Sequence, residues 1–475
     1  MQNSCQIPTP IEYVNRMLDV AGYTSDLYGK RILENSCGDG NILCEIVCRY
    51  IADCKKQGHN NAQISSGLSS DIVGYETDSA CAERCISRLN SILIDENLPP
   101  VRWNIHNVDY LKADGGSFDF VVGNPPYITY HDLDVESRTF LRNHFDSCKA
   151  GRFDYFYAFT EKAYASLNSK GTMVYLVPFG LFRNKFADFL RDMLKEDIVS
   201  ILDCSEREVF GNVTTSVAII TVVKGSNSKE FYYRKISEDK GKYVDKTSLS
   251  DKWFFNVHQN HSNDGLRFGD YFVIKNSVAT LCNKAFLITE YEETDAYYVI
   301  GDQRVEKDVV RQAVSAKSCK KKTNDMIIFP YKKGPSNYEH FSDEEFHCKY
   351  PEAYEYIRSF ADNLSERKKS DGVLWFEYGR TQAINDVDGE KLIMPMVVTT
   401  KVTAYKVSDS AVPYAGYFIK QKDGSSYNLE FAKTILESDE FYEYVKTHGT
   451  PTTDSSYRIS VKEIENYTIG GKQHG

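Results

Sequence analysis

The first 225 residues alternate short β-like apolar runs with segments of helical periodicity, and this alternation limits the folds open to the chain. Between the runs, apolar residues recur three or four positions apart, as in 156–167 and 186–194. Such an order predicts a mostly parallel sheet with helices on both faces. The strand-like runs are 31–35, 71–76, 118–122, 172–177, 199–203 and 216–223.

A polar stretch between about residues 225 and 265 separates this pattern from the rest of the chain. A chain of 475 residues is long enough for two or three domains, so we expect a domain boundary in this stretch. The remainder is rich in Tyr and Lys and alternates only over short distances, which suggests mixed strands and helices.

The composition is that of a globular protein, with 41% hydrophobic and 26% charged residues. The sequence contains no apolar run of about 18 residues, so it predicts no membrane span, and its N-terminus lacks the pattern of a signal peptide. The 12 cysteines are scattered, without the paired spacing of a zinc site. We therefore expect reduced thiols, no metal, no membrane partner and a cytoplasmic location.

The net charge of −10 argues at face value against nucleic acid as a partner, because phosphates are bound by Lys and Arg. Net charge is a poor guide when basic residues are clustered. Such clusters occur in the second half, at 317–322, 332–333 and 367–369.

A strand-to-helix turn near residue 35 carries two glycines, Gly38 and Gly40. They let the backbone turn tightly and approach a ligand, and the helix that follows offers free N–H groups. No Gly-Lys-Ser/Thr follows, and the three-glycine dinucleotide fingerprint is absent. The end of the second strand then carries Glu76, a residue type that accepts hydrogen bonds from ribose hydroxyls.

The segment Asn124-Pro125-Pro126-Tyr127 directly follows a buried-type strand. Two prolines in a row cannot continue a central strand and hold the backbone in an extended turn. This arrangement presents the Asn amide and a carbonyl at the C-terminal end of the sheet, where open α/β folds bind ligands.

These elements, in this order, resemble the gamma-class N6-adenine DNA methyltransferases of restriction–modification systems, the Taq-type enzymes. The resemblance is strong over residues 7–223 and diffuse beyond. It implies a Rossmann-like class I methyltransferase catalytic domain, placed at 1–245, and a C-terminal α+β target recognition domain, placed at 246–475. It further implies S-adenosylmethionine as methyl donor, double-stranded DNA as substrate and a prokaryotic host, and it leaves open whether a separate cognate restriction endonuclease is a partner.

The resemblance also implies which residues bind the cofactor. An N-terminal segment closes over the methionine part, the glycine turn holds that part, the acidic strand end takes the ribose, and a later Asp-Tyr takes the adenine. The family usually has Pro-Ala-Cys-Gly-Ser-Gly at the turn, whereas this chain has Asn-Ser-Cys-Gly-Asp-Gly and keeps both glycines. The matching residues are Thr9, Pro10, Glu34, Ser36, Gly38, Glu76, Thr77, Asp109, Tyr110 and Asn124.

The N6 of adenine is a poor nucleophile because its lone pair is delocalised into the ring. The side-chain oxygen of Asn124 and the carbonyl of Pro125 or Pro126 are suited to accept the two amine hydrogens and localise that lone pair. The base must leave the duplex to reach such a site. Tyr127 is the first candidate to stack on it, and Phe186 the second.

Sequence reading is expected in the C-terminal half, where 327–333 and 375–382 resemble landmarks of the family's recognition domain. Arg380 and Gln382 have the side-chain geometry to contact guanine and adenine edges. Lys332 and Lys333 are expected to contact phosphates.

Three alternatives stay open. The same motif serves protein-glutamine and RNA N-methyltransferases, although those chains generally lack such a C-terminal extension. A DNA-binding subunit with a decayed site would not need Glu76 and Asn124–Tyr127. A bifunctional restriction enzyme would need a nuclease, for which the sequence offers no Asp…Glu-x-Lys cluster and, before residue 7, little room.

Overall fold

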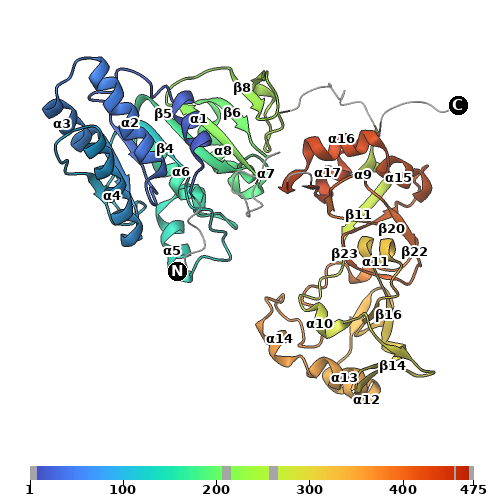
Figure 1. Ribbon diagram of the computed structural model, residues 1–475. Coiled ribbons are helices and arrows are strands. Elements are labelled where there is room, and N and C mark those ends of the chain that lie inside the picture. Colours follow the sequence, from blue (N-terminus) through green and yellow to red (C-terminus); the bar gives the residue numbers. More distant parts are fainter. Residues whose placement is uncertain (1–7, 206–215, 256–265, 454–455, 470–475) are drawn as a thin grey trace. The chain divides into compact units, whose positions relative to one another are not determined.

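The computed structural model describes residues 8–205, 216–255, 266–453 and 456–469. The chain forms two compact units, residues 1–257 with 450–455 and residues 258–449 with 456–475 (Figure 1). None of the helices in the described ranges is both long and apolar enough to cross a membrane.

A nine-stranded sheet forms the centre of the first unit, in the order β3-β2-β1-β4-β5-β7-β6-β8-β9. The strands β3, β2, β1, β4 and β5 run parallel to one another, while β7 is inserted antiparallel between β5 and β6. The strands are β1 (Ile32–Glu34), β2 (Ile72–Tyr75), β3 (Asn104–His106), β4 (Phe118–Gly123), β5 (Leu167–Pro178), β6 (Ile198–Asp203), β7 (Val217–Val223), β8 (Glu230–Lys235) and β9 (Lys242–Asp245).

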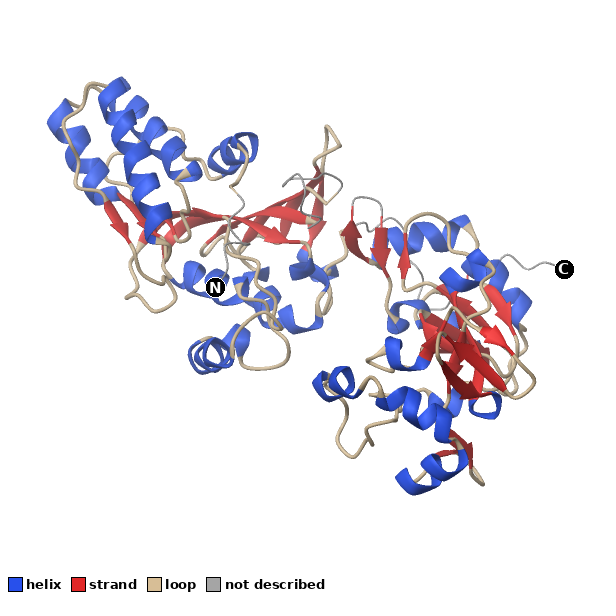
Figure 2. Ribbon diagram, turned by 60° about the horizontal axis from the view of Figure 1, so that its bottom comes forward, coloured by secondary structure: helices blue, strands red, loops and turns tan. Residues whose placement is uncertain are grey.

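Helices cover both faces of this sheet (Figure 2). Successive residues of a strand point to opposite faces, and in β5 Met173 and Tyr175 enter one core while Val174 and Leu176 enter the other. One core is completed by α1 (Ile11–Val20), α2 (Asn41–Lys56), α3 (Asn61–Asp71) and α4 (Ser79–Asp95). The other is completed by α5 (Val135–His144), η1 (Asp146–Cys148), α6 (Phe156–Ala165), α7 (Gly180–Arg183), η2 (Lys185–Ala187) and α8 (Asp188–Lys195).

The helices begin where the sequence places capping residues. Asp78 accepts a hydrogen bond from Cys81 N at the start of α4, and Asp134 accepts one from Ser137 N at the start of α5. The six predicted strand runs correspond to β1, β2, β4, β5, β6 and β7. The alternation therefore predicted the sheet, and it missed only the short or late strands β3, β8 and β9.

The first unit extends beyond residue 245, the boundary expected from the sequence. The η3 turn (Lys246–Ser248) contacts the first unit through Lys246, whose Nζ donates a hydrogen bond to Glu196 O at 2.6 Å. Trp253 and Phe255 are buried in its core. Both aromatic side chains pack on Phe231 of β8, so the first compact unit includes this segment and ends at residue 257.

The second unit has mixed strands and helices around two cores. One four-stranded sheet, β11-β24-β20-β22, is antiparallel; another, β12-β17-β16-β23, joins β16 and β23 in parallel. The strands are β10 (Leu266–Arg267), β11 (Phe272–Asn276), β12 (Leu287–Ile288), β13 (Glu292–Glu293), β14 (Tyr297–Ile300), β15 (Gln303–Glu306), β16 (Val310–Ser315), β17 (Met326–Ile328), β18 (Tyr331–Lys333), β19 (Tyr338–His340), β20 (Lys391–Met394), β21 (Val397–Val398), β22 (Tyr405–Val407), β23 (Val412–Ala415), β24 (Tyr417–Gln421), β26 (Ser456–Arg458) and β27 (Thr468–Ile469), while β25 (Thr450–Thr453) belongs to the first unit.

The helices of this unit are short. They are α9 (Phe268–Tyr271), α10 (Asn283–Phe286), η4 (Lys307–Val309), α11 (Ala316–Lys321), α12 (Asp343–Lys349), α13 (Pro351–Arg358), α14 (Ala361–Glu366), η5 (Ile384–Asp386), α15 (Leu429–Leu436), α16 (Asp439–His448) and α17 (Val461–Glu465).

Candidate active site

Three of the predicted motifs follow neighbouring parallel strands of the first unit. The glycine turn follows β1, Glu76 follows β2, and Asn124 follows β4. Because β2, β1 and β4 are adjacent and parallel, their carboxyl ends lie together at one edge of the sheet. The backbone joins the first two motifs directly, since Cys37 N donates to Tyr75 O at 2.9 Å.

The glycine turn needs both of its glycines. Gly38 and Gly40 have φ angles of 51° and 83°, in the left-handed region that side chains disfavour. At Gly40, which precedes the first residue of α2, a Cβ would also lie 2.6 Å from Cys85 Sγ. The turn can therefore bring the N-terminus of α2 close to a ligand only with glycine at this position.

Glu76 binds the turn to the end of β2. It is buried, and its two carboxylate oxygens accept hydrogen bonds from Gly38 N and Asp78 N, each at 2.8 Å. Thr77, the neighbouring predicted residue, is exposed and donates its hydroxyl to the same carboxylate at 3.4 Å. A carboxylate has about four acceptor sites, so Glu76 retains capacity to accept ribose hydroxyls.

Asp109 and Tyr110 lie in a tight turn after β3. Asp109 accepts a hydrogen bond from Leu111 N at 2.9 Å through one carboxylate oxygen. Tyr110 is buried, with its ring against Tyr75. Lys162 of α6 holds this turn by donating to the carbonyls of Tyr110 and Ala113, both at 2.6 Å, and of Leu111 at 3.2 Å. The sequence reading missed Lys162, because a lysine fifty residues away carries no local signal of such a contact.

Asn124 is held at both its backbone and its side chain. Its Nδ2 donates to Thr9 Oγ1 at 3.3 Å, and its backbone carbonyl accepts from the Ser36 hydroxyl at 3.1 Å. Its Oδ1 is buried and has no hydrogen-bond partner among the described residues. A buried carbonyl oxygen without a hydrogen-bond donor lowers the stability of the fold, so a ligand that donates to this atom would be favoured.

The N-terminal segment reaches this edge through Thr9 and Pro10. Thr9 is buried, and its carbonyl also accepts from Asn41 Nδ2 at 3.3 Å. Pro10 is the N-cap of α1, and its carbonyl accepts from Tyr13 N at 2.9 Å. Thr9 thereby contacts both Asn41 at the start of α2 and Asn124. Nothing in the sequence indicated that Asn41 would contact the N-terminal segment.

The residues after Asn124 are fixed by contacts with β5 and α6. Pro125 is buried and Pro126 is half-buried. The Tyr127 hydroxyl donates to Leu176 O at 2.9 Å, and the Tyr127 ring lies edge-on to Phe156 with centroids 6.3 Å apart. The orientation of the Tyr127 ring is thus set by the strand and helix behind it.

Phe186 lies in η2 and is 37% exposed. Its ring lies against Gly151, where a Cβ would meet Phe186 Cδ1 at 2.0 Å. Arg191 is buried and holds the turn before η2 by donating to the carbonyls of Leu181 and Asn184, both at 2.8 Å. An exposed aromatic ring on a fixed turn is available for stacking, which stays a prediction.

The donors and acceptors at this edge fit S-adenosylmethionine. Glu34 is buried, and its Oε2 has no partner among the described residues. Burial raises the pKa of Glu34 well above its usual value, so a cationic amino group beside it would restore its charge. Glu34, Glu76 and Asp109 are the three carboxylates that the resemblance assigns to the methionine part, the ribose and the adenine amine of the cofactor, and these assignments stay predictions.

The predicted DNA-contacting residues lie in the second unit. Lys333 in β18, Arg380 and Gln382 are exposed. Lys332 is paired with Glu345 at 2.7 Å, so its charge is already partly balanced. Whether these residues touch DNA stays a prediction.

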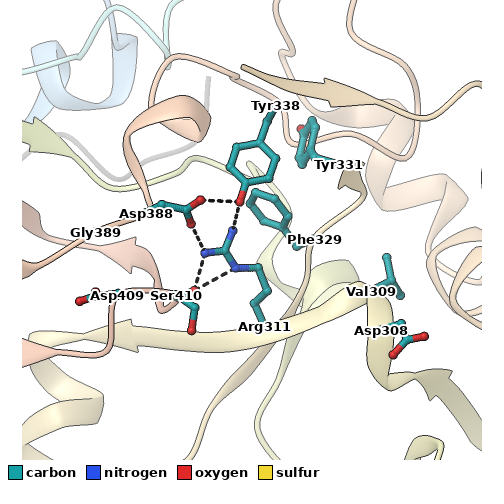
Figure 3. Close-up of a pocket in the computed structure, with 10 residues that line it drawn as sticks. All are labelled: Asp308, Val309, Arg311, Phe329, Tyr331, Tyr338, Asp388, Gly389, Asp409 and Ser410. Carbon is teal, nitrogen blue, oxygen red and sulfur yellow. Dashed lines mark hydrogen bonds and ion pairs between the residues drawn. The ribbon is translucent and has the colours of Figure 1, made fainter. Parts of the chain in front are cut away.

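The two landmark segments of this unit pack against each other. The Tyr378 hydroxyl donates to Ile328 O at 2.7 Å, and Tyr378 N donates to the Tyr331 hydroxyl at 2.9 Å. Beside them, a cavity of about 440 Å³ surrounds Arg311 (Figure 3). Arg311 donates to the Tyr338 hydroxyl, to Asp388 and to Ser410 O, so the protein itself engages its guanidinium. No group of His, Cys, Asp and Glu suited to a metal ion occurs within the described ranges of either unit.

Comparisons with known proteins match this arrangement. Residues 53–210 match the family described as Eco57I restriction-modification methylase. The Escherichia coli type II restriction enzyme and methyltransferase RM.Eco57I is 20% identical over 469 residues, covering 85% of this chain and 46% of its own. The Geobacillus stearothermophilus type II methyltransferase M.BstVI is 26% identical over 238 residues, covering 47% of this chain and 42% of its own. The chain therefore spans less than half the length of these relatives.

A solved structure shares the fold over nearly the whole chain. It is that of the type IIL restriction-modification enzyme MmeI in complex with DNA, with a TM-score of 0.59 and 14% identity, covering 96% of this chain and 64% of that one. These comparisons confirm the resemblance to restriction–modification methyltransferases and the fold class inferred from the motifs.

Proposed function

We propose that this chain is a site-specific DNA methyltransferase of a restriction–modification system that transfers a methyl group from S-adenosylmethionine to the N6 of adenine. The observation that carries the proposal is the state of Asn124. Thr9 accepts from its Nδ2, which leaves its Oδ1 as a buried acceptor without a donor. An amine hydrogen is the donor that this atom lacks.

The residues of the chain act by position and by hydrogen bonding. Asn124 Oδ1 accepts one amine hydrogen and a proline carbonyl accepts the other, so the nitrogen lone pair localises away from the ring. Pro125 and Pro126 keep the two acceptors in a fixed relation because their φ angles are restricted. Asn is suited to this task because it accepts without placing a full negative charge beside the reacting centre.

The cofactor supplies an electrophilic methyl group on a sulfonium. Glu34, Glu76 and Asp109 would hold its amino, ribose and adenine groups, with Gly38 allowing a close approach of the backbone. Much of the rate enhancement is expected from alignment of amine and methyl at near contact, which can be worth about 7–11 kcal/mol.

Nucleoside analysis tests the proposal. Purified protein, labelled S-adenosylmethionine and plasmid DNA should yield N6-methyladenine in the DNA, and Asn124→Ala should abolish it while cofactor binding by calorimetry persists. Label in protein or RNA substrates only, or N4-methylcytosine in place of methyladenine, would overturn it. Long-read mapping of a host that expresses the chain would then give the target sequence.

A further inference from the structure

We infer that Arg138 and Arg142 of α5 bind phosphates of the DNA strand that carries the target base, beside the site of base extrusion. The inference rests on the proposed function and extends it, because it names where the catalytic unit contacts the DNA backbone.

The two arginines flank one aromatic ring next to the Asn124–Tyr127 segment. They lie four residues apart, which puts them on the same face of α5. Their guanidinium carbons are 4.6 Å and 5.6 Å from the centroid of Tyr130, which is three residues beyond Tyr127. Tyr130 and Phe153 are in edge-to-face contact, and Ile128 O accepts from Tyr155 N at 2.9 Å, so this loop has a fixed position.

Arg142 also connects the loop that follows Tyr127 with the loop before α6, against which the ring of Phe186 packs. Its Nη2 donates to the Tyr130 hydroxyl at 3.0 Å and to Gly151 O at 3.2 Å. Gly151 is the residue on which the ring of Phe186 lies. Arg142 therefore sits between the loop after Tyr127 and the turn of Phe186.

In the part of the chain that the structure describes, neither arginine has a carboxylate within ion-pair distance, although the charge of Arg138 contributes, after the hydrogen bond from Ser137 N, to lowering the pKa of Asp134. Arg138 donates to His131 O at 3.1 Å, and its Nε is buried without a partner among the described residues. The nearby carboxylates have other roles, since Asp134 caps α5 and Asp132 accepts from the Thr129 hydroxyl.

Two guanidinium groups that form no ion pair with the described residues, at the rim of a site for an extruded base, suit phosphate oxygens. Arginine binds phosphate through its planar fork of N–H donors, and such contacts fix register without reading sequence. Rotation of one nucleotide out of the duplex brings its flanking phosphates to the mouth of the site, where these charges lie. The exposed Arg152 and Lys185, next to Gly151 and Phe186 in the chain, add to the same positive rim.

Salt-dependent binding tests the inference. The probe is a fluorescent duplex with one adenine opposite an abasic site, so extrusion does not depend on a recognition sequence. Anisotropy titrations between about 50 and 200 mM salt give the negative slope of log K against log[salt]. We expect the magnitude of this slope to be smaller by about 0.9 in Arg138→Gln and in Arg142→Gln than in the wild type. Arg142→Lys, which keeps the charge, and Arg102→Gln, an exposed arginine beside β3, should keep the wild-type slope.

The outcomes separate this inference from the proposed function. Wild-type slopes in both glutamine variants, with normal DNA binding, would overturn the phosphate contact and leave the methyltransferase proposal standing. A lower stability of Arg138→Gln without a change of slope would point to packing on Tyr130 alone and would also overturn it. Failure of the wild-type protein to bind this duplex at low salt would overturn the proposed function itself.

Discussion

The hydroxyl oxygen of Thr9 lies 3.3 Å from Nδ2 of Asn124 and accepts its hydrogen bond across 115 residues of sequence. In this contact the nitrogen end of the Asn124 amide faces Thr9. The amide nitrogen is occupied, and the oxygen remains for a donor. A residue near the N-terminus thereby orients the side chain on which the proposed chemistry depends.

Replacement of Thr9 tests that orientation. Thr9→Val removes the acceptor at constant shape, and we expect kcat to fall about five-fold, the equivalent of about 1 kcal/mol for one hydrogen bond. Thr9→Ser keeps the oxygen and should retain most of the activity. Equal rates in the two variants would show that the hydroxyl does not orient Asn124.

Glu76 should control cofactor affinity. In Glu76→Gln one carboxylate oxygen becomes an amide nitrogen, so it cannot accept from both Gly38 N and Asp78 N. Loss of a charged hydrogen bond of about 1.5–3 kcal/mol corresponds to a roughly 10- to 100-fold higher Kd for S-adenosylmethionine by calorimetry. Glu83→Gln, on the exposed face of α4, is the matched control, and a similar Kd in both variants would contradict the assignment.

Lys162 should act on cofactor binding through the Asp109 turn. Lys162→Met leaves the carbonyls of Tyr110, Leu111 and Ala113 without their shared donor, so the turn loosens. We expect KM for S-adenosylmethionine to rise several-fold while kcat changes little. Lys56→Met, at the exposed end of α2, should alter neither constant.

Asp154 should give the first unit a measurable pH dependence. Burial raises the pKa of Asp154 to about 6, whereas an aspartate in the unfolded chain titrates near pH 4. Between these values the native state holds a proton that the unfolded state has released, so this group adds stability as pH falls from about 6 to about 4. Above pH 6 the buried charge of Asp154 lowers the free energy of unfolding.

Asp154→Asn removes that titration. Its free energy of unfolding should exceed that of the wild type by about 1–2 kcal/mol at pH 7 to 8 and should match it near pH 4. Hydrogen exchange of the α6 amides at several pH values measures the difference. A gain that persists at pH 4 would mean that packing, and not charge, is responsible.

Tyr127 should matter most when the target base is paired. Tyr127→Ala removes the flat face that would offset unstacking, a contribution of about 1–3 kcal/mol. Its loss of activity should be larger on a paired adenine than on an adenine opposite an abasic site. Tyr127→Phe keeps the ring and lacks the hydroxyl that donates to Leu176 O, so its loss of activity should be smaller on both substrates. Equal losses of Tyr127→Ala on the two substrates would remove the stacking role.

By itself, the sequence determined the strand-and-helix order of the first unit and which residue types lie at its sheet edge. Both are local properties: apolar periodicity sets β1, β2 and β4, and the glycines and prolines restrict the backbone at Gly38, Gly40, Pro125 and Pro126. Because the strands are parallel and adjacent, residues at their carboxyl ends are gathered without further information.

Only the tertiary structure decided which partner each polar atom found and where each segment packs. Ser36 departs from the family pattern, and its hydroxyl is bonded to the carbonyl of Asn124, a contact that spacing cannot reveal. Trp253 extends the first unit beyond residue 245, within the polar stretch, because burial of an aromatic ring outweighs the polarity of its neighbours. Lys332 looked free in the sequence but meets Glu345 in space. Such pairings depend on distances between remote parts of the chain, which exist only once the chain has folded.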